Sequence, residues 1–171
     1  MYPALFKNLI LPLYEKIKGL SKESFASNHP GGLLGKTLRL KVANLMIAAK
    51  DCATVGEEAN LEEVILRMTK FNVGLCAVTN KGGELLGVIA EGDIRRSFTG
   101  PEKAQGLNQS AGSVMTKTPV TVSPESMAYE ALKLMEKRSS QISVIPVVDG
   151  KQFAGVIRLH DLVKEGFSLD Q

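Results

Sequence analysis

The chain has 171 residues, of which 44% are hydrophobic and 23% charged, the composition of an ordinary soluble globular protein. Its net charge of +3 is small and its basic residues are mixed with acidic ones, so the sequence does not favour nucleic-acid binding. The longest apolar run falls well short of the ~20 residues that cross a bilayer, and no signal-peptide pattern opens the chain. We therefore expect a cytoplasmic protein that has no membrane partner.

The chain contains two cysteines, Cys52 and Cys76. They show no C-x-x-C spacing, and no cluster of histidines or cysteines accompanies them. Such isolated thiols are typical of a reducing cytosol, and the pattern favours buried or idle side chains over metal ligands. The sequence therefore predicts no metal site.

The first 19 residues carry apolar side chains at spacings of three and four, which predicts an amphipathic helix. Pro12 lies inside this segment and predicts a kink or a restart, and Gly19 marks its end. A single helix has no surface of its own to bury against. This segment is therefore typical of the end of a preceding domain, or of a packing arm.

A loop dense in proline and glycine follows at residues 27–36 and contains a lone histidine, His29. Three glycines within five residues would allow the backbone to approach a phosphate or a sugar closely. The spacing alone favours an interdomain linker over such a site, because neither a strand nor a Lys-Ser/Thr pair follows.

Residues 61–71 are predicted to form a helix that is capped by Asn60. The spacing of three and four places four apolar side chains inward, namely Leu61, Val64, Ile65 and Met68. Two strands are predicted next, at 73–79 and 85–90, joined by a glycine-containing turn. A short helix over residues 93–98 closes this unit.

Residues 99–110 are polar and rich in turn-forming residues, so we expect an exposed connection to a second unit. That unit opens with an extended piece at 118–122. Ser126 is the predicted cap of a helix that ends at Lys137. Two strands at 143–148 and 153–157 then form a hairpin through a turn at Asp149-Gly150.

The two units are copies of one sequence pattern. The segment from Gly87 to Asp93 is repeated from Gly155 to Asp161, and the offset between the copies varies from 67 to 69 residues. Each unit has the order β-α-β-β-α. A unit this small buries a core only by packing on its copy, so we predict two face-to-face sheets with clefts along a pseudo-two-fold axis.

These features resemble a known family. Twin β-α-β-β-α units that each end in Gly-Val-Ile-x-x-x-Asp and a short helix resemble a pair of CBS domains (a Bateman module) over about residues 42–166. The segment from Phe25 to Gly35, with its Ser-Asn-His-Pro-Gly-Gly stretch, resembles the junction in arabinose-5-phosphate isomerases of the KpsF/GutQ type. In that family a sugar-isomerase (SIS) domain precedes the CBS pair.

The resemblance implies an α/β (α+β) fold of tandem CBS domains preceded by an N-terminal helical segment. Residues 1–38 would then be the end of an SIS domain and a linker, residues 39–100 the first CBS domain and residues 101–171 the second. His29 would correspond to the histidine of the family's sugar-phosphate site, an acid or base for moving a proton between C1 and C2. The family's lysine, glutamates and phosphate loop lie upstream of this segment, so the resemblance implies a chain that is not an active isomerase alone.

In many CBS pairs an aspartate at the start of the short helix binds ribose hydroxyls, and a Ser/Thr three residues earlier contacts phosphate. The resemblance places Asp93 and Asp161 at the aspartate position. Ala90 and Arg158 occupy the hydroxyl position, a departure from the family pattern. A carboxylate suits a vicinal diol because it accepts two charge-assisted hydrogen bonds. The alternative is that each aspartate only caps its helix.

Positive charge gathers around the same corners, from Arg95, Arg96, Arg158 and His160. Guanidinium groups suit phosphate and carboxylate oxygens. Arg95 and Arg96 are adjacent and cannot both face one cleft, which makes Arg158 the better candidate. The resemblance implies a small anionic, nucleotide-like ligand such as AMP, ATP or the pathway end product CMP-Kdo, and no required cofactor.

Three functions stay open on the sequence. The first is a regulatory, ligand-sensing CBS pair of an arabinose-5-phosphate isomerase, which serves the Kdo, lipopolysaccharide or capsule precursor pathway. The second is an isomerase fragment acting through His29, for which Lys36 and Glu23 are the nearby candidate partners. The third is a dimerisation scaffold without a ligand. A homodimer through the CBS domains is expected in the first and third cases.

Overall fold

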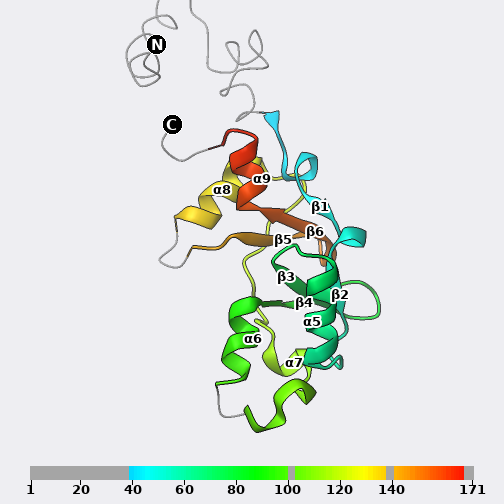
Figure 1. Cartoon of the computed structure of the whole chain (residues 1–171). Coiled ribbons are helices and arrows are strands. Elements are labelled where there is room, and N and C mark those ends of the chain that lie inside the picture. Colours follow the sequence, from blue (N-terminus) through cyan, green and yellow to red (C-terminus); the bar gives the residue numbers. More distant parts are fainter. Residues whose placement is uncertain (1–38, 100–102, 138–140, 168–171) are drawn as a thin grey trace, which may run out of the picture.

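The structure, a computed structural model, describes residues 39–99, 103–137 and 141–167. These residues form two small α/β units stacked on each other, with the long helix and hairpin of the first below those of the second in Figure 1. The predicted N-terminal helix and the loop that contains His29 lie outside the described residues.

Each unit contains one long helix, a hairpin and a short closing helix; the label η marks a 3-10 helix. The first unit comprises η2 (Val42–Asn44), β1 (Ile47–Ala48), η3 (Ala49–Asp51), β2 (Ala53–Val55), α5 (Leu61–Lys70), β3 (Leu75–Thr79), β4 (Leu85–Ala90) and α6 (Glu91–Ser97). The connection holds η4 (Lys103–Asn108). The second unit comprises α7 (Ala111–Val114), α8 (Ala128–Glu136), β5 (Val144–Asp149), β6 (Gln152–Arg158) and α9 (Leu159–Lys164).

Helix α5 forms where the sequence predicts it. The Asn60 side chain accepts the backbone N–H of Glu63 at 2.9 Å, as expected for an N-cap. Leu61 and Val64 are fully buried, whereas Leu66 on the outer face is 64% exposed. The apolar stripe therefore packs on the sheet, and the polar face meets solvent.

Helix α8 begins one residue later than Ser126 would require, so the predicted serine cap is wrong. Met127 is the N-cap residue, and its backbone N–H donates to the Glu130 carboxylate at 3.2 Å. The Ser126 carbonyl accepts the N–H of Val42 at 2.9 Å. Ser126 is thus held by a distant segment, which a local capping rule does not detect.

The strands form two three-stranded sheets, with the orders β2-β3-β4 and β1-β6-β5. Strand β4 has the predicted bounds, but β3 starts at Leu75 rather than residue 73, after Gly74 with φ +92°. The second hairpin turns at Gly150 and Lys151, one residue later than predicted, because Asp149 still pairs with Gln152. The second unit's extended piece contributes one bridge, Val122 to Val147.

The opening segments of the two units are exchanged, a feature that the sequence analysis missed. Strand β1 belongs to the first unit in the chain but pairs with β6 of the second, through Ile47↔Val156 and Ala48↔Gly155. Reciprocally, Thr116 forms an antiparallel bridge with Val88 of β4. Each sheet is therefore completed by chain from the other unit.

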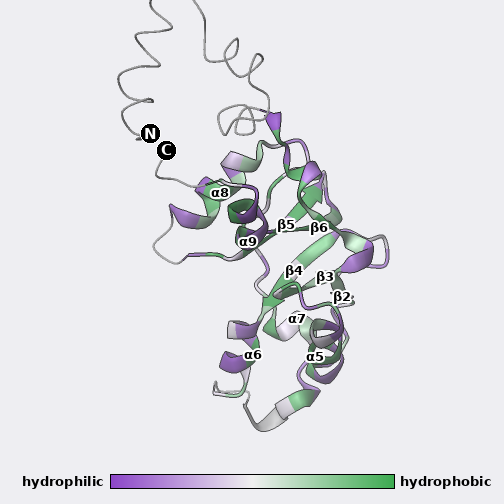
Figure 2. Cartoon of the chain, turned by 45° about the horizontal axis from the view of Figure 1, so that its top comes forward, coloured by the Kyte–Doolittle hydropathy of each residue, from purple (hydrophilic) through white to green (hydrophobic). Residues whose placement is uncertain are grey.

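Three apolar clusters hold this arrangement together, and Figure 2 shows apolar residues running along the strands of both units. One lies inside each unit, and the third lies between the two sheets. The cluster between the sheets contains Cys52, Val73, Leu75, Ala77, Val88, Phe153 and Val156. The predicted face-to-face packing of two sheets is confirmed.

The connection between the units is less exposed than predicted. Gln109 is only 1% exposed, and its side-chain amide donates to the carbonyls of Ser97 at 3.3 Å and Gly106 at 3.2 Å. The backbone carbonyl of Gln109 accepts the backbone N–H of Leu61 at 3.0 Å. A buried polar residue of this kind costs little because its hydrogen bonds are made, and it fixes the connection on the first unit.

Candidate functional site

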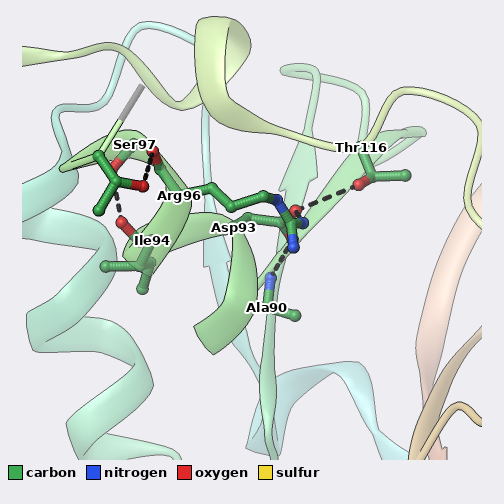
Figure 3. Close-up of polar contacts among 7 residues, drawn as sticks. Ala90, Asp93, Ile94, Arg96, Ser97 and Thr116 are labelled. Carbon is green, nitrogen blue, oxygen red and sulfur yellow. Dashed lines mark hydrogen bonds and ion pairs between the residues drawn. The ribbon is translucent and has the colours of Figure 1, made fainter. Parts of the chain in front are cut away.

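The Asp93 corner, made of Ala90, Asp93, Arg96 and Thr116, lies where β4 passes into α6 (Figure 3). Asp93 is 8% exposed, and its Oδ2 accepts the backbone N–H of Ala90 at 2.8 Å. Its Oδ1 forms an ion pair with the Arg96 guanidinium, and the Thr116 hydroxyl lies 3.5 Å from the same oxygen. Backbone, helix and the exchanged segment of the second unit thus converge on one carboxylate.

The local sequence explains this geometry. Helix α6 starts at Glu91, two residues earlier than predicted, so Asp93 is its third residue and Ala90 its N-cap. Alanine has no side-chain acceptor, and the Asp93 carboxylate satisfies the exposed N–H from inside the first turn. A Cβ at Gly92 would lie 3.3 Å from Arg96 Nη1, so the glycine leaves room for the arginine to fold back.

The Asp161 corner, made of Arg158, His160 and Asp161, lies at the equivalent passage from β6 into α9. Arg158 is the N-cap residue, and Asp161 is the third residue of the helix. Arg158 Nε donates to Asp161 Oδ2 at 2.7 Å and Arg158 Nη2 donates to Asp161 Oδ1 at 2.9 Å, so the two side chains form a bidentate ion pair. The two side chains are 32% and 22% exposed, so solvent reaches this pair more readily than it reaches Asp93.

The electrostatics of this corner follow from that pair. The hydrogen bonds from Arg158 hold the pKa of Asp161 below its ordinary value despite partial burial, and the charges of Arg158, His160 and Lys164 act in the same direction. The same hydrogen bonds raise the pKa of Arg158. Both side chains are thus kept charged at neutral pH.

The stability of the protein should depend on pH through Asp161. Because the folded-state pKa is lowered, the stabilisation is complete above the unfolded value of about 3.9 and is lost as the pH falls through the folded-state value. We expect Asp161→Asn to lower the free energy of unfolding at neutral pH, and the difference from wild type to shrink on acidification. Urea unfolding followed by circular dichroism from about pH 6 to pH 2 measures this.

Asp149→Asn is the matched control, since Asp149 is exposed at a hairpin end and has no ion pair among the described residues. Its difference from wild type should stay near zero across the same pH range. A pH-independent loss of stability in Asp161→Asn would contradict the role given to the Arg158 pair.

The other predicted site residues lie around these corners without joining them. Arg95 is exposed on α6, and its side chain makes no hydrogen bond or ion pair to another described residue. His160 is exposed on α9. The sequence analysis missed Arg96 and Thr116 as partners of Asp93. The i,i+3 spacing of Asp93 and Arg96 signals the first, but no local pattern signals Thr116, which comes from the other unit.

The predicted buried thiols are confirmed. Cys52 and Cys76 are buried and free, and burial raises their pKa values to about 11 and about 12, so neither forms a reactive thiolate at neutral pH. Within the described ranges, histidine, cysteine and carboxylate side chains nowhere gather in threes as metal ligands would. Over those same residues, no helix has the length and apolar character to cross a bilayer.

Two surface hollows accompany the corners. One, of ≈ 560 Å³, is lined by the start of β4, residues 117–119 and 121, and the end of the β5–β6 hairpin. The other, of ≈ 540 Å³, lies between α5 and α6 and includes Gly74, Glu91 and Ile94. Neither lining includes Asp93 or Asp161. The nucleotide cleft at these two aspartates therefore stays a prediction.

Comparisons with known proteins agree with this architecture. The family model for the CBS domain matches residues 42–100 and 111–167. An arabinose 5-phosphate isomerase, KdsD, of Yersinia pestis is 34% identical over 152 residues, which cover 88% of this chain and 45% of the relative. The chain thus spans about half the length of the curated relatives that it matches.

Solved structures show the same fold. The crystal structure of CBSX2 in complex with AMP has a TM-score of 0.66 at 17% identity and covers 78% of this chain and 100% of that one. The CBS domain pair of protein MJ0100, in complex with 5′-methylthioadenosine and S-adenosyl-L-methionine, has a TM-score of 0.61 at 19% identity, with coverages of 72% and 93%. With two matched segments that correspond to the two stacked units, this chain belongs to the CBS-domain family and is a tandem CBS pair.

Proposed function

We propose that this chain is the regulatory, ligand-sensing CBS pair of an arabinose-5-phosphate isomerase and that it binds a nucleotide or nucleotide sugar at the Asp161 corner. The observation that carries the proposal is the partly exposed Arg158–Asp161 pair at the start of α9. A carboxylate that can accept from a ribose diol and a guanidinium that can hold a phosphate stand side by side there.

The pairing of Arg158 with Asp161 supports a switchable site. Each charge satisfies the other, so a neutral nucleoside would have to displace Arg158 in order to reach both oxygens of Asp161. A nucleotide carries both a diol and a phosphate and therefore gives each residue a new partner. The Asp93 corner offers less, because its carboxylate is buried and already has three partners.

The parent activity is part of the same proposal. Similarity to the isomerases suggests that a separate SIS domain interconverts ribulose 5-phosphate and arabinose 5-phosphate for Kdo in lipopolysaccharide or capsule precursors. The CBS pair would then sense a product of that pathway, such as CMP-Kdo, or the nucleotides AMP and ATP, in the cytoplasm. The solved CBS pairs that hold AMP or S-adenosyl-L-methionine support a nucleotide-like ligand.

A ligand panel tests the proposal. Calorimetry of the full chain with AMP, ATP, CMP, CMP-Kdo and adenosine should show one nucleotide binding clearly more tightly than the others. Asp161→Ala should weaken that ligand about tenfold or more, because charge-assisted hydrogen bonds are lost. Arg158→Ala should weaken the nucleotide but leave adenosine binding unchanged or tighter, since Asp161 is then freed.

Arg67→Ala provides the control, because it also removes an arginine from a helical ion pair, with Glu63 at 3.9 Å, but does so on α5. It should leave all affinities unchanged. Equal and weak binding of all five ligands, unchanged in Asp161→Ala and in Arg158→Ala, would contradict the proposal. Formation of ribulose 5-phosphate from arabinose 5-phosphate by this chain alone would instead favour the isomerase fragment acting through His29.

A dimerisation scaffold is the second candidate, and exposed apolar side chains on the helices favour it. Leu66 on α5, Leu134 on α8 and Val163 on α9 are 64%, 39% and 53% exposed. Apolar side chains on outer helix faces are suited to bury against a second copy of the chain. A homodimer in analytical ultracentrifugation, together with no measurable binding of any of the five ligands in calorimetry, would favour the scaffold over the sensor.

A further inference from the structure

The ≈ 560 Å³ hollow is a second polar feature, separate from the two corners. Its walls come from both units: Glu84 just before β4 and Leu85 and Leu86 at its start, four of the residues from Lys117 to Thr121 in the second unit, and the end of the β5–β6 hairpin. Strand β4 runs from Leu85 at the hollow to Ala90 at the Asp93 corner. At a rise of about 3.3 Å per residue, the two places are roughly 16 Å apart.

The charges around this hollow are not balanced. Lys117 and Lys151 both line it and are exposed, and neither forms an ion pair with a described carboxylate. Glu84 is the single acidic residue of the lining, and its carboxylate accepts the Asn80 side-chain amide at 2.7 Å. The lining thus holds two lysines and one carboxylate, and that carboxylate already has a partner.

Hydroxyl groups add uncharged donors to the same wall. Thr118 and Thr121 line the hollow, and neither side chain makes a hydrogen bond to another described residue. Ammonium and hydroxyl donors together form the environment that a phosphate group prefers. The volume falls in the range of ≈ 300–1,000 Å³ that is usual for small-molecule sites.

The two copies differ at the wall of the hollow formed by residues 117 to 121. Ile47 and Thr116 hold equivalent bridge positions, and Val55 and Val122 hold equivalent positions further on. Seven residues, 48–54, lie between Ile47 and Val55 in the first unit, whereas five residues, 117–121, lie between the equivalent Thr116 and Val122 in the second. The second copy is therefore shorter by two residues across this stretch.

The local conformations differ accordingly. In the first unit the stretch turns back as η3, which packs on β6 and is closed by the Cys52 N–H to the Ala49 carbonyl at 3.1 Å. In the second unit Pro119 disfavours a helical turn at the preceding Thr118, and the chain from Lys117 to Thr121 has no helix. The second unit therefore has no 3-10 turn equivalent to η3 along this wall of the hollow.

We propose that this hollow binds a small organic phosphate, with Lys117 and Lys151 pairing with the phosphate group and the two threonine hydroxyls donating to its oxygens. The site takes a phosphomonoester rather than a nucleoside, because its lining offers cations and hydroxyl donors but no aromatic ring for a base to stack on. A ligand there contacts β4 of the first unit and the hairpin of the second, so it links the two units. The proposal does not depend on a nucleotide at the Asp161 corner.

Calorimetry with glycerol 3-phosphate, inorganic phosphate and glycerol tests this on the full chain. Glycerol 3-phosphate should bind, inorganic phosphate more weakly, and glycerol not at all. In the double variant Lys117→Gln/Lys151→Gln the affinity for glycerol 3-phosphate should fall about tenfold or more. Both lysines are exposed, so the variant should fold as the wild type does.

Lys50→Gln is the matched control, because Lys50 lies in η3, the element that fills the equivalent place in the first unit. It should leave the affinity unchanged. Equal affinity in wild type and the double variant would overturn the site, as would tight binding of inorganic phosphate alone with none of glycerol 3-phosphate. Asp161→Ala separates the two proposals: it should weaken the tightest nucleotide of the panel about tenfold or more and leave glycerol 3-phosphate unaffected. Loss of glycerol 3-phosphate binding in Asp161→Ala would place that ligand at the corner instead.

Discussion

Val42→Asp should destabilise the second CBS unit, although Val42 belongs to the first unit in the chain. Val42 is fully buried in the cluster that contains Ala131, Leu132 and Ile145. A carboxylate placed there has no cationic partner in that apolar cluster, and an unpaired buried charge is among the most destabilising changes known. We expect the free energy of unfolding to fall by about 4 kcal/mol or more.

Ala43→Asp is the control, because Ala43 follows Val42 in the same 3-10 helix but is exposed. Its effect should stay within about 0.5 kcal/mol. Urea unfolding compares the two variants, and hydrogen exchange locates the damage. We expect amides of β5 and α8 to lose protection before those of β3 and α5. Loss of protection confined to the first unit would contradict the exchange of the opening segments.

Gly155→Ala is expected to have the second-largest effect. Gly155 lies opposite Ala48 in the β1–β6 pair, and a Cβ at this position would lie 2.0 Å from the Ile47 carbonyl oxygen. Its backbone φ of +150° is also one that residues with a side chain rarely adopt. Either β1 leaves the sheet or the backbone is strained, and we expect a loss of about 3 kcal/mol or more.

Gly56→Ala is the control, since a Cβ there meets no atom within 4 Å. Its effect on the thermal midpoint should be small, whereas Gly155→Ala should lower the midpoint clearly in the same calorimetric scan. Equal midpoints for the two variants would show that β1 does not pass over Gly155 as described.

The repeated glycine of the Gly-Val-Ile motif thus has a tertiary cause. Its first copy, Gly87, lies 2.7 Å, measured from a Cβ built on it, from the Thr116 carbonyl oxygen. In both units the exchanged segment crosses the hairpin at this residue and leaves no room for a side chain. The motif is visible in the sequence, but the residue that crosses it is 29 positions away for Gly87 (Thr116) and 108 positions away for Gly155 (Ile47).

Local features of the fold were predictable because nearest neighbours decide them. The cap of α5 at Asn60 depends on one side chain and one N–H three residues away. Strand β4 is set by an apolar run between a glycine-rich turn and a polar corner. The Ser126 cap was predicted wrongly by the same kind of rule, because its carbonyl is bound to Val42, 84 positions earlier.

The candidate site divides in the same way. The sequence placed Asp93 and Asp161 at equivalent corners, and the pairing of Arg158 with Asp161 lies within one helical turn. The contact of Thr116 with Asp93, by contrast, joins residues of different units. The lysine-lined hollow depends on how three separate segments meet, and no single stretch of sequence signals it.

The sequence by itself determined that this protein is built from two copies of one β-α-β-β-α unit, because apolar periodicity and turn residues act over a few neighbouring positions. Only the tertiary structure decided which opening segment completes which sheet, which side chains hold Asp93, and where a hollow stays open. The physical reason is that burial and hydrogen bonding between distant segments depend on how both units pack. Local propensity depends only on neighbouring residues and does not predict that packing.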